Sequence, residues 1–286
     1  MRESQEILKI VLDKAAYDKR ILAVVLTGSR ANPEIPADPF QDYDFILVVE
    51  EFESFLKDQS WLEIFGDRII MQIPELMFTG EAGKKEPALH FLMLFTDGNR
   101  IDLTLTTTLH SKQYCSEDPF QVLLDKNNIL AGIPLSPGKN RLIKKPVKKE
   151  FQDVCNECWW VSANIAKGLA RGEPGYAREM FEIPVRSMFM KMIEWHIGVE
   201  SSFSVSFGKG GRFMKKQVSP SLYQDILLTY PDGDPENTWK ALFRLLEIFG
   251  VLSKAVAKSL GFSYKRQEEE GIIKYLEQVY RDTKTR

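Results

Sequence analysis

The chain has 286 residues, a length that predicts two domains at about 150 residues each. Hydrophobic residues make up 44% and charged residues 27% of the chain, which excludes a disordered or low-complexity protein, and three cysteines are too few for a disulfide framework. A net charge of −2 and the lack of an apolar run approaching about 18 residues favour neither a nucleic-acid nor a membrane partner, so we expect a folded cytoplasmic protein whose oligomeric state stays open.

The first part of the chain is predicted to mix helices and strands. Apolar residues at helical spacing predict a helix over 6–17. The continuous apolar run 21–26 predicts a strand buried on both faces, which ends at Thr27. Further strands are expected over 42–49, 68–72, 90–95 and 100–106. The last two of these flank Asp97-Gly98, which predicts a hairpin turn between them.

Two shorter features separate these strands. The prolines between 31 and 39 predict a loop. Ser60, followed three residues later by Glu63, matches a capping box that opens a short helix, and Gly66 is expected to end it.

After about residue 140 the pattern becomes helical. Prolines and basic residues over 134–149 predict a linker. Helices are expected over 150–171, 176–199, 220–229, 236–260 (ended by Gly261) and 268–281. We therefore predict an α+β fold with a mixed-sheet domain over 1–140, followed by an α-helical bundle domain over 141–286.

Polar residues stand at strand ends in the first domain. Gly28-Ser29 follows the first strand, Asp42 and Asp44 open the next, and Asp102 lies in a later one. Because side chains alternate along a strand, Asp42 and Asp44 project to one side, and Asp102 points away from the apolar face of its own strand. If these strands are neighbours, the three carboxylates converge.

Converging carboxylates need a cation. Two like charges about 4–5 Å apart repel by roughly 3–4 kcal/mol at an effective dielectric near 20. A divalent metal removes this repulsion, and carboxylate oxygens suit Mg²⁺, which keeps waters and phosphate oxygens as its other ligands. Gly28 lets backbone N–H groups approach a phosphate, and Ser29 adds a hydroxyl donor. Each feature alone is commonly a turn or a solvated loop, but together they predict phosphoryl or nucleotidyl transfer.

Longer motifs surround these residues and extend over most of the chain: Gly28-Ser29-Arg30, Asn32-Pro33, 40–44, 61–66, Asp97-Gly98, 101–105, Glu150-Phe151, Asn156-Glu157 and 167–171. With them the sequence resembles the aminoglycoside 6-adenylyltransferases, also called streptomycin adenylyltransferases, of the polymerase-β-like nucleotidyltransferase superfamily. The resemblance implies a nucleotidyltransferase domain over 1–140, a helical C-terminal domain, and transfer of AMP from ATP to a streptomycin hydroxyl with Mg²⁺. Two segments, 78–86 and 106–108, depart from the family pattern and leave the acceptor open.

The predicted helix over 150–171 carries a polar stripe opposite its apolar face. Its members follow at spacings of three and four residues: Asp153, Glu157, Trp160, Asn164, Lys167 and Arg171. The carboxylates stand about 20 Å before the cations, at about 1.5 Å per residue. One interpretation is a solvated face that follows the helix dipole. The other is that Lys167 and Arg171 bind a triphosphate, while Asp153 or Glu157, with Trp160, faces a cationic acceptor.

The functional hypothesis is a Mg²⁺-dependent nucleotidyltransferase that acts on ATP and a cationic aminoglycoside, streptomycin first, and releases pyrophosphate. Asp42, Asp44 and Asp102 are the predicted metal ligands. Asp102 is also the predicted general base, with Glu157 as its rival. The predicted nucleotide contacts are Gly28, Ser29, Arg30, Lys167 and Arg171. The alternatives are a nucleotidyltransferase that acts on another small molecule or a protein, and a catalytically idle regulatory protein of the same fold.

Overall fold

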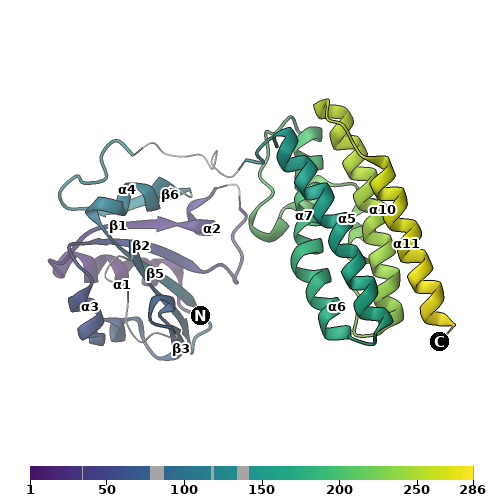
Figure 1. The fold of residues 1–286 in the computed structure, drawn as a ribbon. Helices are drawn as coiled ribbons and strands as arrows, with labels where there is room; N and C mark the ends of the chain where they lie inside the picture. Colours follow the sequence, from purple (N-terminus) through teal and green to yellow (C-terminus); the bar gives the residue numbers. More distant parts are fainter. Residues whose placement is uncertain (34, 78–86, 117–118, 134–141, 286) are drawn as a thin grey trace. The chain divides into compact units, whose positions relative to one another are not determined.

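The computed structural model describes residues 1–33, 35–77, 87–116, 119–133 and 142–285 (Figure 1). The chain divides into two compact units, Met1–Asn140 and Arg141–Arg286, which we call the sheet unit and the helical unit. The predicted α+β fold, with a mixed sheet first and helices after it, is confirmed.

The sheet unit is built on six strands in the order β3-β4-β5-β2-β1-β6. Their bounds are β1 Ile21–Thr27, β2 Tyr43–Val49, β3 Arg68–Gln72, β4 Ala88–Phe95, β5 Arg100–Thr107 and β6 Phe120–Asp125. Among the strands of the described residues, β2 and β5 are the parallel neighbours, and the other pairs are antiparallel. Because parallel neighbours begin at the same edge of a sheet, β2 and β5 bring their first residues together there.

Helices cover both faces of the central strands (Figure 1). Helix α1 (Ser4–Tyr17), helix α3 (Glu53–Lys57) and the 3₁₀ helix η1 (Ser60–Phe65) share one hydrophobic core with the inner face of β2 and β5. Helix α4 (Thr108–Ser116) packs against β2 and β5 and contributes Cys115 to a smaller core on the other face. Strand β1 contributes side chains to both cores, Val24 to the first and Val25 to the second, so the prediction that it is buried on both faces is confirmed.

Turns in the sheet unit follow the sequence signals in part. The predicted hairpin joins β4 to β5, with the Phe95 amide donating to the Asn99 carbonyl at 2.9 Å and Gly98 in the left-handed region at φ +83°. The predicted capping box is wrong, because Ser60 lies inside η1 and its own amide donates to the Asp58 carboxylate at 2.9 Å. Gly66, at φ +95°, ends this helix as predicted.

The sheet unit also contains elements that the sequence did not predict. These are β6 and the helices α2 (Gly28–Ala31), α3, η2 (Pro74–Leu76) and α4. The segment 78–86, which departs from the family pattern, lies outside the described residues, as does most of the proline-rich part of the predicted linker, 134–141.

The helical unit contains a bundle of long helices. Its elements are α5 Lys148–Ala170, α6 Pro174–Met180, η4 Phe181–Val185, α7 Arg186–Glu200, η5 Lys209–Gly211, α8 Met214–Gln217, α9 Pro220–Leu227, α10 Pro235–Leu260 and α11 Arg266–Lys284. Helix α5 packs against α6, α7, α10 and α11. Gly261 ends α10 in the left-handed region at φ +69°, as predicted. Among the described residues, no helix combines the length and apolar character needed to cross a membrane.

The helix predicted over 176–199 is interrupted in the structure. A single π-helical turn, η4, separates α6 from α7 and contains Pro184. Proline has no N–H to donate, and its ring would clash with the carbonyl four residues earlier in a regular α-helix, so the widened turn accommodates it.

Candidate active site

Two of the predicted aspartates face each other across neighbouring strands. The parallel register of β2 and β5 places Asp44 directly opposite Asp102, and the antiparallel register of β1 and β2 places Asp44 opposite Thr27. Thr27 immediately precedes Gly28-Ser29, so the first strand delivers these residues to the same point of the sheet. The fold therefore brings together three segments that lie far apart in the sequence.

Strand alternation sorts the side chains as predicted. Tyr43 is 2% exposed and stacks in the core with Phe45, whereas Asp44 between them is half-buried on the opposite face. In β5, Ile101 and Leu103 are fully buried and Asp102 leaves the core between them, with 16% of its side chain exposed. The aspartates therefore stand on the face opposite the main core, at the edge where β2 and β5 begin.

An arginine that sequence reasoning missed forms ion pairs with two of the three predicted aspartates, Asp42 and Asp102. The Arg100 guanidinium donates to both oxygens of Asp102, from Nε at 2.9 Å and Nη2 at 2.7 Å, and its Nε lies 3.7 Å from the nearer oxygen of Asp42. The bonds with Asp102 raise the pKa of Arg100 against the effect of its burial, and the charges of Asp42 and Asp44 raise it further. Strand alternation could have identified this contact, because Arg100 precedes Asp102 by two residues and therefore lies on the same face of the strand.

The Asp42 carboxyl is disfavoured in its charged form. Burial raises the pKa of the Asp42 carboxyl, and the neighbouring Asp102 carboxylate raises it too, while Arg100 and Arg30 oppose the rise. In the protein alone, the Arg100 guanidinium offsets part of this repulsion, and the metal site stays a prediction.

Gly28 opens the single-turn helix α2 instead of an irregular turn. Its φ is +72°, a conformation that side-chain-bearing residues rarely adopt, and a Cβ placed on it would overlap Oδ2 of Asp44. Both the backbone conformation and the space therefore require glycine at this position, next to the aspartate pair.

Arg30, predicted to bind phosphate, is engaged with the protein in this structure. Its guanidinium donates to the Gln41 carbonyl at 2.8 Å, to the Asp42 carbonyl at 3.0 Å and to Ser4 Oγ at 3.1 Å. It also lies 3.7 Å from the ring centroid of Tyr43. These contacts hold the segment that enters β2 and carries Asp42.

A histidine that sequence reasoning passed over lies on the same sheet face. His90 in β4 stands opposite Thr104, two residues from the position opposite Asp102. Its Nδ1 lies 2.5 Å from one oxygen of Glu75, and its amide donates to the other oxygen at 3.0 Å. Alternation along β4 was enough to place His90 on this face.

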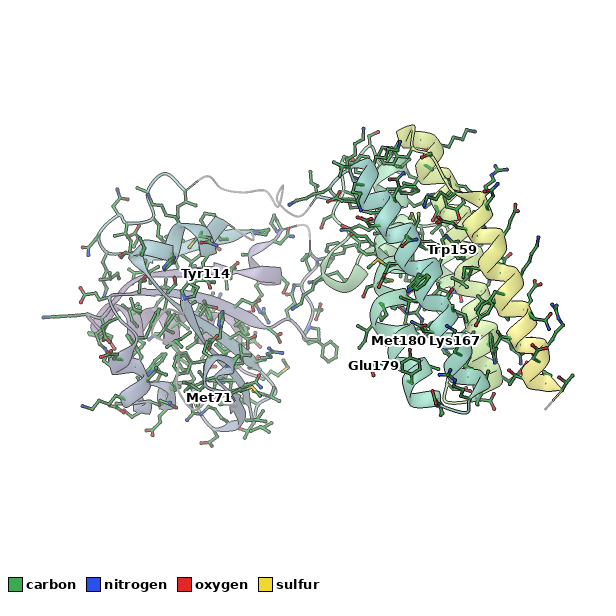
Figure 2. All side chains as sticks on the ribbon, in the orientation of Figure 1. Met71, Tyr114, Trp159, Lys167, Glu179 and Met180 are labelled. Carbon is green, nitrogen blue, oxygen red and sulfur yellow. The ribbon has the colours of Figure 1, made fainter. Side chains whose placement is uncertain are left out.

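The polar stripe of α5 faces solvent within the helical unit. Asp153, Glu157, Lys167 and Arg171 are exposed, and Trp160 is 70% exposed. The opposite face of the helix packs in the core, where Trp159 is 3% exposed (Figure 2 labels both Trp159 and Lys167). Asp153 forms an ion pair with Lys149 one turn earlier. The predicted amphipathic helix is confirmed, and an exposed tryptophan stands in the middle of its polar stripe.

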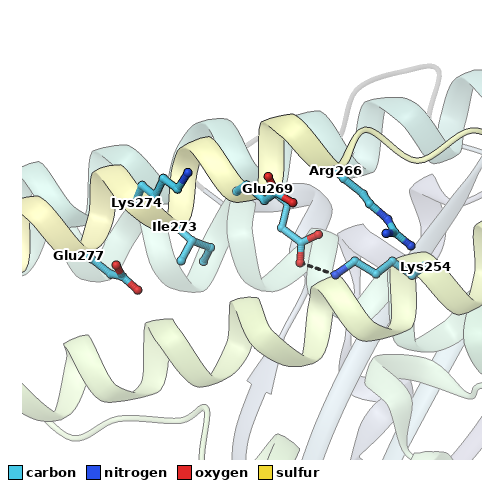
Figure 3. Close-up of a pocket in the computed structure, with 7 residues that line it drawn as sticks. Lys254, Arg266, Glu269, Ile273, Lys274 and Glu277 are labelled. Atoms are coloured by element: carbon cyan, nitrogen blue, oxygen red, sulfur yellow. Dashed lines mark hydrogen bonds and ion pairs between the residues drawn. The ribbon is translucent and has the colours of Figure 1, made fainter.

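The helical unit also contains a surface groove between α10 and α11 (Figure 3). Side chains of both charge signs line it, and Lys254 and Glu269 form an ion pair of 2.8 Å across it. None of the predicted site residues lines this groove.

The donor set on the sheet suits a hard divalent cation. Carboxylate oxygens are the ligands that Mg²⁺ prefers, and the guanidinium between Asp42 and Asp102 shows that this point of the sheet accommodates a cation. Within the described part of the chain, no three His, Cys, Asp or Glu side chains are arranged as a metal site as they stand. A metal on Asp102 would have to share the carboxylate with Arg100 or displace it.

The chain is similar to known proteins over nearly its whole length. Residues 1–279 match the family described as streptomycin adenylyltransferase. The aminoglycoside 6-adenylyltransferase of Bacillus subtilis (strain 168) is 40% identical over 284 residues, covering 98% of this chain and 99% of that protein. The enzyme of the same name from Campylobacter jejuni is 37% identical over 271 residues, covering 94% and 93%. The crystal structure of an aminoglycoside 6-adenyltransferase from Bacillus subtilis is 37% identical, with a TM-score of 0.48 over 98% of this chain and 99% of that one. This chain therefore belongs to the streptomycin adenylyltransferase family of nucleotidyltransferase enzymes.

Proposed function

We propose that this enzyme transfers AMP from ATP to a hydroxyl of an aminoglycoside, with streptomycin as the first acceptor to test, and releases pyrophosphate. The observation that carries the proposal is the direct pairing of Asp44 with Asp102 beside Gly28, on a sheet face away from the main core. The names of the relatives support the aminoglycoside as the acceptor class. The cytoplasm is the compartment that we propose for this reaction.

Asp42, Asp44 and Asp102 are the proposed ligands of Mg²⁺, which when bound would stabilise the attacking and leaving oxygens around the α-phosphate. Gly28 leaves room for the Asp44 carboxylate, and Ser29 offers a hydroxyl donor to the nucleotide phosphates. Asp102 is the proposed acceptor of the hydroxyl proton of the aminoglycoside, with Glu157 as the alternative base.

Arg30 is assigned a supporting part in this proposal. Because its guanidinium is bonded to the carbonyls of Gln41 and Asp42, it fixes the backbone from which Asp42 projects. A direct contact with phosphate, as the sequence predicted, would require at least one of these bonds to open.

The stripe of α5 is proposed to supply further substrate contacts. Lys167 and Arg171 carry exposed positive charges for the triphosphate. Asp153 and Glu157 carry exposed negative charges for the cationic acceptor, and Trp160 offers an exposed apolar ring to its sugar rings.

The test is pyrophosphate release from ATP and Mg²⁺ across a panel of aminoglycosides, with other nucleoside triphosphates as donor controls. The proposal expects release only when an acceptor is present, and expects Asp44→Asn to abolish it. If pyrophosphate is released only with an acceptor that is not an aminoglycoside, the enzyme acts on another substrate class. A well-folded protein that releases none with any acceptor would favour an idle regulatory protein.

A further inference from the structure

Arg100 and a metal ion would compete for the same two oxygen atoms. Both oxygens of Asp102 accept bonds from Arg100, at 2.9 and 2.7 Å. A divalent cation on Asp102 would have to share these two oxygens with the guanidinium, and the repulsion between two positive charges so close together favours displacement of Arg100. The Arg100 side chain is 45% exposed, so water screens the ion pair and the exchange is accessible.

We propose that Arg100 binds the nucleotide phosphates after a divalent ion has displaced it from Asp102. In the protein alone its guanidinium balances the aspartates, and in the loaded enzyme it balances the triphosphate. This inference rests on the proposed function, because it requires a metal and a nucleotide at the same point of the sheet.

Once displaced from Asp102, the Arg100 guanidinium needs another anion as its partner. Arginine stays protonated in proteins, so Arg100 cannot relieve a lost ion pair by releasing a proton. Its planar fork matches phosphate oxygens in the same bidentate manner in which it now matches the Asp102 carboxylate. The incoming triphosphate is the anion that arrives together with the metal.

Of the two arginines at this site, Arg100 is better placed than Arg30 to contact the nucleotide phosphates. Among the ion pairs of the described residues, those of Asp42 and Asp102 both come from Arg100. The other arginine of the site, Arg30, already donates to two backbone carbonyls. Arg100 begins β5, two residues before Asp102, and its long side chain can turn towards a phosphate without any movement of the strand.

The alternative is that Arg100 stays on Asp102 and only holds its carboxylate in place. The two possibilities predict opposite changes in metal affinity. If Arg100 competes with the metal, its removal strengthens metal binding in the absence of nucleotide. If Arg100 only positions Asp102, its removal weakens metal binding.

The experiment titrates Mn²⁺ into nucleotide-free protein, followed by electron paramagnetic resonance, for the wild type, Arg100→Gln and Arg100→Lys. Arg68→Gln, on β3 of the same sheet, removes the same charge elsewhere and is the control. We expect Arg100→Gln to bind Mn²⁺ about fivefold more tightly, the factor that corresponds to an exposed ion pair of about 1 kcal/mol. Arg100→Lys should lie between Arg100→Gln and the wild type, because it keeps the charge but not the fork.

A second titration uses a nonreactive ATP analogue with Mg²⁺. Arg100→Gln should weaken its binding by at least about tenfold, the lower limit for a lost charge-assisted phosphate contact. Circular dichroism of each variant checks that the fold is retained.

Each outcome separates this inference from the proposed function. Unchanged or weaker Mn²⁺ binding by Arg100→Gln, or unchanged binding of the ATP analogue, would overturn the role of Arg100 and leave the proposed function standing. Absence of Mn²⁺ binding by both the wild type and Arg100→Gln would overturn both, because the aspartates would then not form a metal site even without the competing guanidinium.

Discussion

The lack of a side chain at Gly28 leaves the space that the Asp44 carboxylate occupies. Gly28 is held at φ +72°, directly against the Asp44 carboxylate. We predict that Gly28→Ala displaces this carboxylate and lowers the transfer rate by at least about tenfold, because changes to the groups that orient a metal ligand typically cost about 10- to 100-fold in metal affinity or activity. The strain of alanine in the left-handed region should cost about 1–2 kcal/mol of stability.

Gly132→Ala is the matched control for this prediction. Gly132 has a similar φ of +76°, but a Cβ there would meet nothing within 4 Å. It should show a similar loss of stability in thermal unfolding and retain activity. Equal activity losses in the two variants would assign the effect to backbone strain and not to Asp44.

The identity of the base is a second question at the scale of single residues. If Asp102 accepts the hydroxyl proton, Asp102→Asn should slow the chemical step by about 10²–10⁴-fold, the usual contribution of general base catalysis. Glu157→Gln should then have a milder effect. Single-turnover kinetics at saturating substrates measures both rates, and the reverse order would transfer the role to Glu157.

At the scale of elements, a buried arginine connects α7 to the segment that follows α9. Arg186 is 7% exposed and donates to both the hydroxyl and the carbonyl of Thr229 at 2.6 Å, while its guanidinium lies 4.0 Å from the ring centroid of Tyr230. We predict that Arg186→Met destabilises the protein by about 2–3 kcal/mol in urea unfolding, because it leaves a buried carbonyl without its donor.

Arg178→Met provides the comparison for this contact. Arg178 donates to the carbonyls of Pro231 and Asp232, but from an exposed position where water can replace it. Its loss should cost less than about 0.5 kcal/mol. Similar values for the two variants would show that burial of the Arg186 contact does not determine its strength.

The stripe of α5 yields a prediction for a whole helix face. Lys167→Ala should weaken binding of a nonreactive ATP analogue by about 10–150-fold, and Lys258→Ala, an exposed lysine on α10, should not. Asp153→Asn or Glu157→Gln should instead raise the KM for the acceptor. That rise should shrink at 1 M salt, where the screening length is about 3 Å. If isothermal titration and kinetics give wild-type affinity for the ATP analogue and wild-type KM for the acceptor in all variants, the stripe is a solvated face.

For the whole molecule, sequence patterns predicted the features that depend on the local alternation or helical period of side chains. They missed features that depend on which strands pair and in which register. Alternation placed Asp44 and Asp102 on the face away from the core without knowledge of the sheet. The edge strand β6 was missed because most of its side chains are exposed or half-exposed and carry no clear alternation. The contact of Arg100 with Asp42 was missed because it follows from the register of β2 and β5, which no local pattern encodes, whereas strand alternation alone could have placed Arg100 beside Asp102.

The central claim is that an adenylyl group moves from ATP to an aminoglycoside at the aspartate pair. The most direct test supplies ATP labelled with ³²P at either the α- or the γ-phosphate, together with Mg²⁺ and streptomycin, and follows the label. We predict that the α-label enters the antibiotic while the γ-label leaves in pyrophosphate, and that Asp44→Asn prevents both. Appearance of the γ-label in the antibiotic, or unchanged transfer by Asp44→Asn, would contradict the account.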